Sequence, residues 1–293
     1  MYQIVIDCKA NFFMKTLVIS FSGGRTSAYM AKYLKDKYNG KRTILTVFFN
    51  TGKEREETLI FVDQCDKEFE LNVVWVEVDY ANELGFKIVD FKTASRNGEP
   101  FEMVIAKHGI PNMGFPHCTR EMKTVPCNKL LKSMGITDYD LALGIRIDEP
   151  KRLKTKPNII YPLAFEMPMN KKQIIKWWSE QKFDLQLKGY EGNCDLCWKK
   201  SKRKLLTVLV EHPELANWWN EMEIKYGDYV PEKQVKRVTP LTFYRQRESM
   251  VELIEDSKMN FRKSTDDFTL AELMHSEPEL DFTNGCEESC EAF

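Results

Sequence analysis

One stretch decides the fold of this chain: Leu17-Val18-Ile19-Ser20-Phe21-Ser22-Gly23-Gly24-Arg25-Thr26-Ser27, followed directly by Ala28-Tyr29-Met30-Ala31-Lys32-Tyr33-Leu34. An apolar run that ends in glycine and small hydroxyl residues and then becomes helical predicts a buried strand, a tight loop and a helix N-terminus. Glycine permits backbone conformations closed to other residues, and the free N–H groups at a helix start attract anions. We therefore expect a phosphate or sulfate site at residues 22–27.

The spacing in this loop excludes two other phosphate motifs, because it matches neither Gly-x-x-x-x-Gly-Lys-Ser/Thr nor Gly-x-Gly-x-x-Gly. It resembles instead the Ser-Gly-Gly-x-x-Ser pyrophosphate loop of the adenine-nucleotide α-hydrolase superfamily. That superfamily includes ATP pyrophosphatases, tRNA thiolation enzymes and phosphoadenylylsulfate (PAPS) reductases. The resemblance implies that an adenine nucleotide is bound by Ser22, Gly23, Gly24, Arg25, Thr26 and Ser27. The alternative is a glycine-rich turn without a ligand.

Composition limits the class of protein. The chain has 293 residues, of which 43% are hydrophobic and 30% charged, with a formal net charge of -1. These values predict a soluble globular protein, large enough for one big α/β domain with or without a smaller appendage, and no overall electrostatic footprint for nucleic acid, although local basic patches stay open. No run approaches the roughly 18 apolar residues of a membrane span, and the first residues lack a secretory pattern. We expect a cytoplasmic protein without membrane contact.

The next apolar runs, 42–50 and 71–78, alternate with helical segments and predict parallel β-α-β units in a doubly wound sheet. We expect a nucleotide-binding α/β domain at 14–190 and a helical C-terminal region with a cysteine motif at 191–293. The segment 95–116 is rich in Gly, Pro and Asn and has weak periodicity, so we expect a loop that acts as a lid.

A second motif follows the strand 42–50. Asn50-Thr51-Gly52 lies where that strand ends, and the carboxyl ends of parallel strands face one crevice. The segment resembles the Asp-Thr-Gly…Glu-Thr pattern of the PAPS reductases, with Asn50 in place of aspartate. The resemblance implies that Thr51 and Gly52 border the nucleotide.

A third motif is Cys118, Arg120 and Lys123 before Pro126. It resembles the Cys-x-x-Arg-Lys-x-x-Pro segment of the reductases, offset by one residue and with a single cysteine. An Arg and a Lys near a helix start can clamp sulfate, and a nearby cation makes a thiol more nucleophilic. The alternative is a solvated basic turn.

A fourth motif, Gly144-x-Arg146-x-Asp148-Glu149 followed by Arg152, resembles a signature of the same family. Gly144 permits close backbone approach, and the two arginines offer planar forks to phosphate or sulfate oxygens. Asp148 and Glu149 either orient these arginines or hold Mg²⁺.

The cysteines form the last pattern. Cys194 and Cys197 stand in a Cys-x-x-Cys turn, and Cys286 and Cys290 lie in the tail. Similar Gly-Asn-Cys-x-x-Cys segments occur in PAPS reductase-like proteins of phages and mobile elements. One alternative is a structural zinc held by these four thiols. The others are an iron-sulfur cluster on Cys118, Cys194 and Cys197, with or without a tail cysteine, and redox-active thiols without metal.

Together these resemblances run in family order and imply a PAPS reductase-like enzyme. The nucleotide would be PAPS, adenylylsulfate or ATP, and we expect the catalytic residues to be Cys118, Arg120, Lys123 and Arg146. Arg25-Thr26 stands where the pyrophosphatases carry Lys-Asp, which weakens the case for Mg²⁺-dependent adenylation. Two alternatives stay open: an ATP-dependent enzyme that thiolates nucleic acid, and a nucleotide-binding module without turnover. Further partners left open are a thiol or sulfur donor protein, a nucleic acid and a second copy of the chain.

Overall fold

A six-stranded sheet forms the centre of the molecule. The computed structural model describes residues 14–192, 194–234 and 236–266. The strand order is β4-β3-β2-β1-β5-β6. The strands are β1 (Thr16–Ser20), β2 (Ile44–Phe49), β3 (Val74–Val78), β4 (Phe86–Val89), β5 (Tyr139–Ala142) and β6 (Ile159–Ile160). All neighbours pair in parallel except β3 and β4, which form an antiparallel edge.

The order of the strands confirms the predicted doubly wound sheet. From β1 the chain moves outward through β2 and β3 and then returns to β5 on the other side of β1. Ligands in such sheets bind outside the carboxyl ends of the strands, at the point where the order reverses. The loops after β1 and β5 therefore lie at the position where a ligand is expected.

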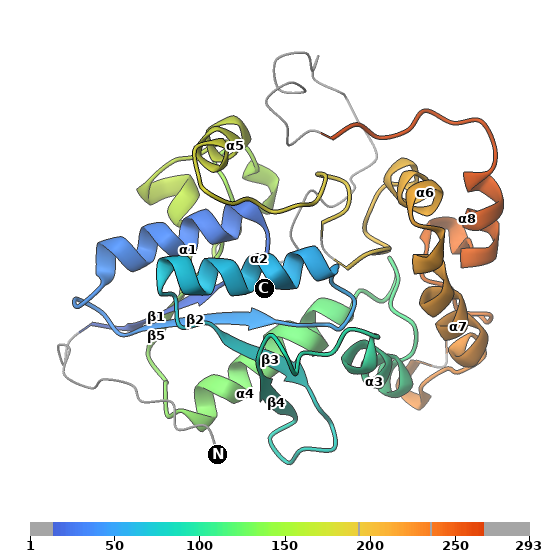
Figure 1. Cartoon of the computed structure of the whole chain (residues 1–293). Coiled ribbons are helices and arrows are strands. Elements are labelled where there is room, and N and C mark those ends of the chain that lie inside the picture. Colours follow the sequence, from blue (N-terminus) through green and yellow to red (C-terminus); the bar gives the residue numbers. More distant parts are fainter. Residues whose placement is uncertain (1–13, 193, 235, 267–293) are drawn as a thin grey trace.

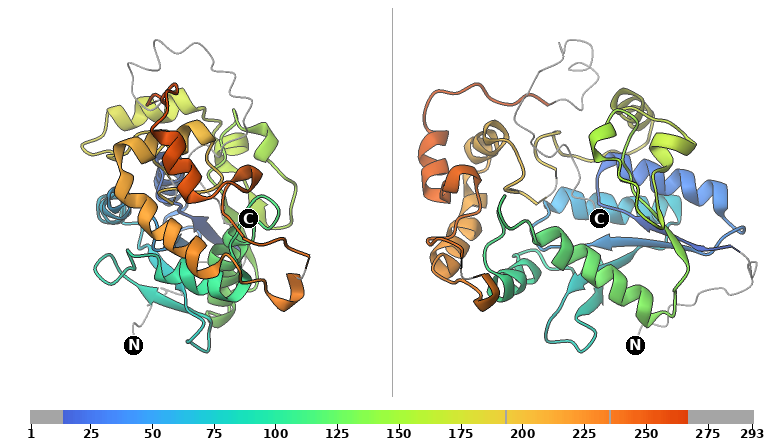
Figure 2. Two further views of the ribbon diagram at one scale, coloured as in Figure 1. Left: turned by 90° about the vertical axis from the view of Figure 1, so that its right-hand side faces the viewer. Right: turned by 180° about the vertical axis from the view of Figure 1, so that it is seen from behind.

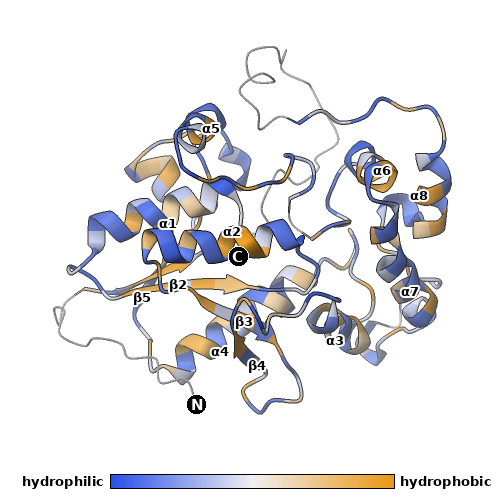
Figure 3. Cartoon of the chain, in the orientation of Figure 1, coloured by the Kyte–Doolittle hydropathy of each residue, from blue (hydrophilic) through white to orange (hydrophobic). Residues whose placement is uncertain are grey.

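Helices cover both faces of the sheet (Figure 1). They are α1 (Arg25–Tyr38), α2 (Glu56–Phe69), α3 (Glu99–His108), α4 (Val125–Ser133), α5 (Lys171–Ser179), α6 (Lys202–Glu211), α7 (Ala216–Tyr226) and α8 (Met250–Ser257). One apolar core lies between the sheet and α1, α2 and α5, and another lies between the sheet and α4. The hydropathy colouring shows the same division, with apolar strands enclosed by helices whose outer faces are polar (Figure 3).

The helices α6, α7 and α8 form a separate group beside the sheet, toward which the β2 arrow points (Figures 1 and 2). Their core is built around Trp219, Phe243 and Leu253, and it also takes in Phe101 of α3 and Cys118. The helical group thus packs directly on α3 and on the segment before α4, both of which lie between β4 and β5 in the sequence. The division at residues 190 and 191 stays a prediction.

The predicted loop at 95–116 is wrong in part, because α3 occupies ten of its residues. Gly98 and Gly109 flank the helix, and Phe101, Val104 and Ile105 give it a buried face at helical spacing. The glycines and prolines that indicated a loop are the terminal signals of a short helix, with Pro100 in its first turn.

None of the helices in the described part of the chain is long and apolar enough to cross a membrane.

Phe61 tests the packing of α2 on the sheet. Its ring is 1% exposed and lies 4.9 Å from the ring of Trp178 in α5. We expect Phe61→Ala to lower the free energy of unfolding by about 3–5 kcal/mol, because it leaves a cavity in the core. The neighbouring residue Ile60 is 41% exposed, so Ile60→Ala should change it by under about 1 kcal/mol. Urea unfolding of both variants measures the difference, and equal losses would contradict the packing described.

Candidate functional site

The loop after β1 is held in shape by its own side chains and by glycine. The Ser27 hydroxyl accepts the Ser22 N–H at 3.2 Å, lies 2.9 Å from the Ser22 hydroxyl and donates to the Gly24 carbonyl at 3.0 Å. Gly23 has φ = +82°, and a Cβ there would lie 2.6 Å from Cγ2 of Thr58. Any larger residue at position 23 would therefore distort the loop.

The N-terminus of α1 suits an anion. Gly24 is its N-cap and offers no side-chain cap, and the first turn contains no acidic residue. The first N–H groups of a helix have no partner within the helix, and they carry the positive end of its dipole. The local geometry predicted for residues 22–27 is therefore present.

Arg25 has a different set of partners from the predicted nucleotide. Its guanidinium forms a two-point ion pair with Asp184, at 2.7 and 3.0 Å, and donates to the carbonyl oxygens of Leu185 and Leu187. It thereby holds residues 184–187 against the loop. That segment leads directly into Lys188 and Gly189, which sequence reasoning missed.

A narrow pocket lies in front of residues 22–27, here called the phosphate loop after their predicted role. It takes residues from the loop, from the start of α2, from the turn before α4 and from the segment that Arg25 holds. Its lining consists of Ser22, Gly23, Gly24, Arg25, Glu54, Thr58, Lys123, Leu185, Lys188, Gly189, Gly192 and Cys194.

The loop after β2 is a closed hydrogen-bond network. The Asn50 amide donates to Glu77 Oε1 at 2.6 Å and to the Ser95 carbonyl at 2.8 Å. Glu77 is fully buried, and it also accepts from the Ser95 N–H and pairs with Lys87. An aspartate at position 50 would place two carboxylates in contact, which explains why this chain has asparagine there.

Thr51 and Gly52 are buried, and neither of them lines the pocket in front of residues 22–27. Both the N–H and the hydroxyl of Thr51 donate to Glu54 Oε2 at 2.8 Å. Burial raises the pKa of Glu54, an effect that the charge of Lys123 opposes. Gly52 has φ = +76° and packs against Pro100 of α3. Glu54 thus emerges as a half-buried acid at the pocket that its sequence context did not single out.

The loop after β5 reaches the phosphate loop through Arg146. This side chain is 2% exposed, donates to the Thr26 hydroxyl at 3.3 Å and pairs with Asp148 at 2.9 Å and with Glu149. Glu149 also pairs with Arg152. Gly144 is buried at the end of β5. The two acids therefore contact the arginines, as in one of the two predicted roles.

The two cations predicted to clamp an anion, Arg120 and Lys123, have different surroundings. Arg120 is exposed, pairs with Glu121 and lines neither pocket described here. Lys123 is buried and lines the phosphate-loop pocket. Of the two predicted cations, Lys123 is therefore the one placed to meet an anion there.

Cys118 and the two cysteines of the Cys-x-x-Cys turn, which is distant from it in sequence, line one further pocket. This pocket, here called the cysteine pocket, is lined by Thr51, Phe101, Cys118, Thr119, Met122, Lys123, Cys194, Cys197, Trp198 and Trp219. Two of these residues, Lys123 and Cys194, also line the phosphate-loop pocket. The two pockets are therefore adjacent.

The Cys-x-x-Cys turn is fixed by buried charges. Asp195 pairs with Lys53 at 2.9 Å and accepts from the Trp219 indole at 2.7 Å. Lys200 is buried and donates to the carbonyl of Asp195 at 2.7 Å. Burial lowers the pKa of Lys200 to about 8, against the opposing effect of Cys197 and of other acidic groups nearby.

The remaining cysteines have other surroundings. Cys65 and Cys127 are buried in the two cores beside the sheet, and burial raises the pKa of both, to about 12 for Cys127. Cys286 and Cys290 lie outside the described residues. The proposal of a zinc on four thiols rests in part on these two and stays a prediction.

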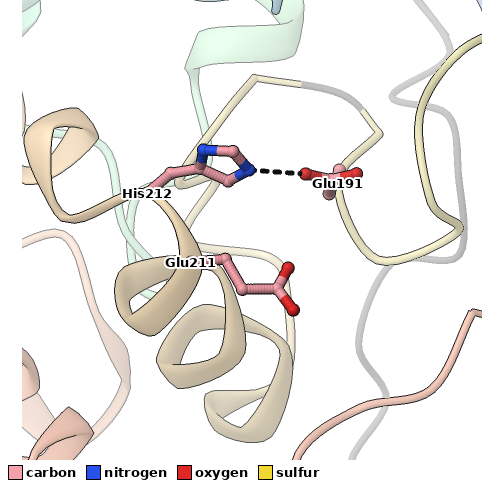
Figure 4. Close-up of side chains that lie close together, drawn as sticks. All are labelled: Glu191, Glu211 and His212. Carbon is pink, nitrogen blue, oxygen red and sulfur yellow. Dashed lines mark ion pairs between the residues drawn. The ribbon is translucent and has the colours of Figure 1, made fainter.

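A second cluster of ionisable groups lies at the end of α6 (Figure 4). Ligand atoms of Glu191, Glu211 and His212 lie within 4.8 Å of one another. Lys188 pairs with Glu211 at 3.0 Å, and Arg55 lies 3.8 Å from Glu191. These cations already compensate the acids, so we interpret the cluster as an ionic clamp.

The comparisons with known proteins agree with this geometry. The profile of the phosphoadenosine phosphosulfate reductase domain family matches residues 16–185. The chain therefore belongs to the phosphoadenosine phosphosulfate reductase domain family.

Among its relatives is the uncharacterized nin region protein ORF290 of Escherichia phage lambda, 35% identical over 94% of each chain. An uncharacterized protein of Methanocaldococcus jannaschii is 25% identical over 73% of this chain, which spans 42% of that protein. A solved structure, phosphoadenylyl-sulfate (PAPS) reductase from Candida auris in a phosphate complex, shares 14% identity. The matched region covers 57% of this chain and 73% of the reductase chain, with a TM-score of 0.38.

Asn50 generates a prediction about pH. In Asn50→Asp the new carboxyl group faces Glu77, and the pair holds a proton in the folded state that the unfolded chain releases. Because the folded-state pKa is raised, the variant should lose stability relative to wild type as pH rises from 5 to 8. Between these two pH values we expect a loss of stability of about 1.4 kcal/mol for each unit by which the folded-state pKa of the pair exceeds about 5.

Asn50→Ala is the control, because it removes the hydrogen bonds that the Asn50 amide donates, together with the one that its oxygen accepts from the Gly52 N–H, without adding a carboxyl group. Its loss of about 1–3 kcal/mol should be the same at both pH values. Urea unfolding at pH 5 and pH 8 measures both variants. A loss in Asn50→Asp that does not change with pH would contradict the contact with Glu77.

Proposed function

We propose that this protein is an enzyme that binds an adenine nucleotide at the phosphate loop and carries out sulfur transfer or reduction at the cysteine pocket. One observation supports the proposal above the others. Lys123 and Cys194 line both pockets, so a group attached to the nucleotide phosphates lies within reach of the thiols. Family membership supports the nucleotide part of the proposal.

The chemistry follows from these groups. Backbone N–H groups of α1 and the ammonium of Lys123 neutralise the phosphates and stabilise the charge that develops when the nucleotide leaves. With a phosphosulfate substrate, a thiolate attacks the sulfur atom, and the sulfur–oxygen bond to the phosphate breaks with its electron pair going to the nucleotide. A second thiolate then attacks the cysteine sulfur, which releases sulfite and leaves a disulfide. An external dithiol donor reduces that disulfide.

The cysteine pocket also presents soft ligands, although its three sulfur atoms do not all lie within 4.8 Å of one another, as the ligand atoms of Glu191, Glu211 and His212 do. Thiolates select zinc and iron-sulfur clusters, and Cys118, Cys194 and Cys197 line this one pocket. When bound, a cluster would supply electrons to the sulfur step, whereas a zinc would fix the turn. The thiols would hold either group through Cys118 and the Cys-x-x-Cys turn.

Lys123→Ala tests the nucleotide site. We expect the dissociation constants for PAPS, adenylylsulfate or ATP to rise about tenfold or more, because a charged hydrogen bond to phosphate is lost. The control is Lys132→Ala, an exposed lysine on α4, which should bind as wild type does. Isothermal titration measures binding, and assays for sulfite and AMP identify the product. Failure of wild type to bind any of these nucleotides would overturn the proposal, and tight binding without product would leave a module without turnover.

Cys194→Ala tests the cysteine pocket. In protein purified without oxygen we expect wild type to hold iron with matching acid-labile sulfide, or zinc without sulfide, and Cys194→Ala to lose it. Cys127→Ala, whose thiol lies in the core beneath α4, should keep the wild-type content. If wild type holds no metal, the proposal requires loss of product formation in Cys194→Ala but not in Cys127→Ala. Equal activity in all three proteins would exclude the sulfur role.

A further inference from the structure

A wide groove lies along the outer edge of the sheet, apart from the phosphate loop. It has a volume of about 620 Å³, and its lining includes Leu153, Lys154, Lys156, Tyr161, Phe165 and Glu166. It runs along β6, the strand at this edge of the sheet, which pairs with β5. In Figure 2 the light green segment that carries these residues lies apart from α6–α8.

The rim of the groove is basic. Residues 151–156 read Lys-Arg-Leu-Lys-Thr-Lys and contain no acid. The side chains of Lys151, Lys154 and Lys156 are exposed, and none of them forms an ion pair within the part of the chain that the structure describes. The one acid that lines the groove, Glu166, is already paired with Lys37 at 2.6 Å. The rim therefore offers positive charge to a ligand.

The rim is also held in place. The Tyr161 hydroxyl donates to the Lys154 carbonyl at 2.8 Å and accepts from the Lys154 N–H at 3.2 Å. Tyr161 itself is buried beneath the loop. This two-point contact fixes the basic segment beside β6.

An aromatic ring stands beside these cations. Phe165 is 73% exposed, an unusual position for a phenylalanine, and its ring lies 6.4 Å from that of Tyr161. Proteins that bind single strands of nucleic acid combine such exposed rings, on which bases stack, with cations that follow the phosphates. An acidic peptide would use the cations but not the ring.

The overall charge of the described body agrees with a polyanionic ligand. Of the 43 basic and 44 acidic residues, the last 27 contain none of the basic and eight of the acidic ones. The first 266 residues thus have 43 basic and 36 acidic residues, a net charge of +7. The near-zero net charge of the whole chain is therefore the sum of a basic stretch of 266 residues and an acidic stretch of 27.

Two other basic runs in the sequence, 199–204 and 233–237, contain residues that are engaged within the fold. Lys200 is buried, Lys202 pairs with Asp256 at 2.6 Å, and Arg237 packs on the Phe115 ring at 4.3 Å. The groove is the better candidate surface. The basic segment beside it is also connected to the loop after β5, because Arg152 pairs with Glu149, which pairs with Arg146.

We propose that the groove beside β6 binds a single strand of nucleic acid, with Lys151, Lys154 and Lys156 on its phosphates and Phe165 stacked on a base. This names a substrate class for the nucleic-acid thiolation alternative, and to that extent it rests on the proposed function. Strand binding itself does not need the adenine nucleotide, so the two proposals fail separately.

The test is fluorescence anisotropy with labelled 20-nucleotide single strands of DNA and of RNA, without adenine nucleotide, at 50 and 200 mM salt. The wild-type affinity should fall with salt, with a slope of log K against log salt of about -2 for the three lysines. Lys154→Gln with Lys156→Gln should reduce that slope by about 1.4. Phe165→Ala should weaken binding about fivefold or more. The difference between the affinities for DNA and for RNA shows whether binding depends on the 2′-hydroxyl groups.

Matched controls separate the groove from general charge and exposed surface. Lys92→Gln with Lys258→Gln removes two exposed lysines at the opposite edge of the sheet and beyond α8, and Ile224→Ala trims an exposed side chain on α7. These variants should bind as wild type does, and all variants should melt at the wild-type temperature. Absence of oligonucleotide binding at 50 mM salt, equal weakening in the controls, or equally tight binding of polyglutamate would each overturn the proposal.

Discussion

The carboxylate of Asp195 joins the parts of the molecule that make the site. It pairs with Lys53 from the loop after β2 and accepts the indole N–H of Trp219 from α7, while the Asp195 N–H donates to the Lys53 carbonyl. Both charges are buried, so neither can be satisfied by water if the other moves away. The Cys-x-x-Cys turn therefore stays beside the strand ends, and the helical group that carries Trp219 stays with it.

The phosphate site depends on backbone geometry more than on free arginines. Arg25 is bound to Asp184, and Arg146 to Asp148 and Glu149, so much of the positive charge that the motifs suggested is compensated. The N-terminus of α1 lies at the same pocket, and Lys123 and Lys188 line it. A site of this kind selects anions by shape, because N–H groups in a fixed loop accept only certain positions of the oxygen atoms.

The sequence predicted the parallel sheet and the loops at its carboxyl edge well, because strand patterns and glycine turns are local signals. It also named the three cysteines of one pocket among its alternatives. The assignment of Arg25 to the nucleotide stays a prediction, and the sequence did not reveal the ion pair of its side chain with Asp184, which is 159 positions away. The roles of Lys53 and Asp195 were missed for the same reason, since a pairing between distant segments leaves no trace in either segment alone.

The surroundings of the cysteines, and not their number, divide them into two kinds. Cys127 lies among aliphatic side chains, where burial raises its pKa to about 12 and keeps the thiol neutral and unreactive. The cysteine pocket instead contains an ammonium, Lys123, and a second one, Lys200, lies close behind the Cys-x-x-Cys turn. Cations stabilise negative charge on sulfur, whether that sulfur attacks a substrate or binds a metal. Both uses of the pocket need the same electrostatic surroundings, which is why metal content and product formation have to be measured together to tell them apart.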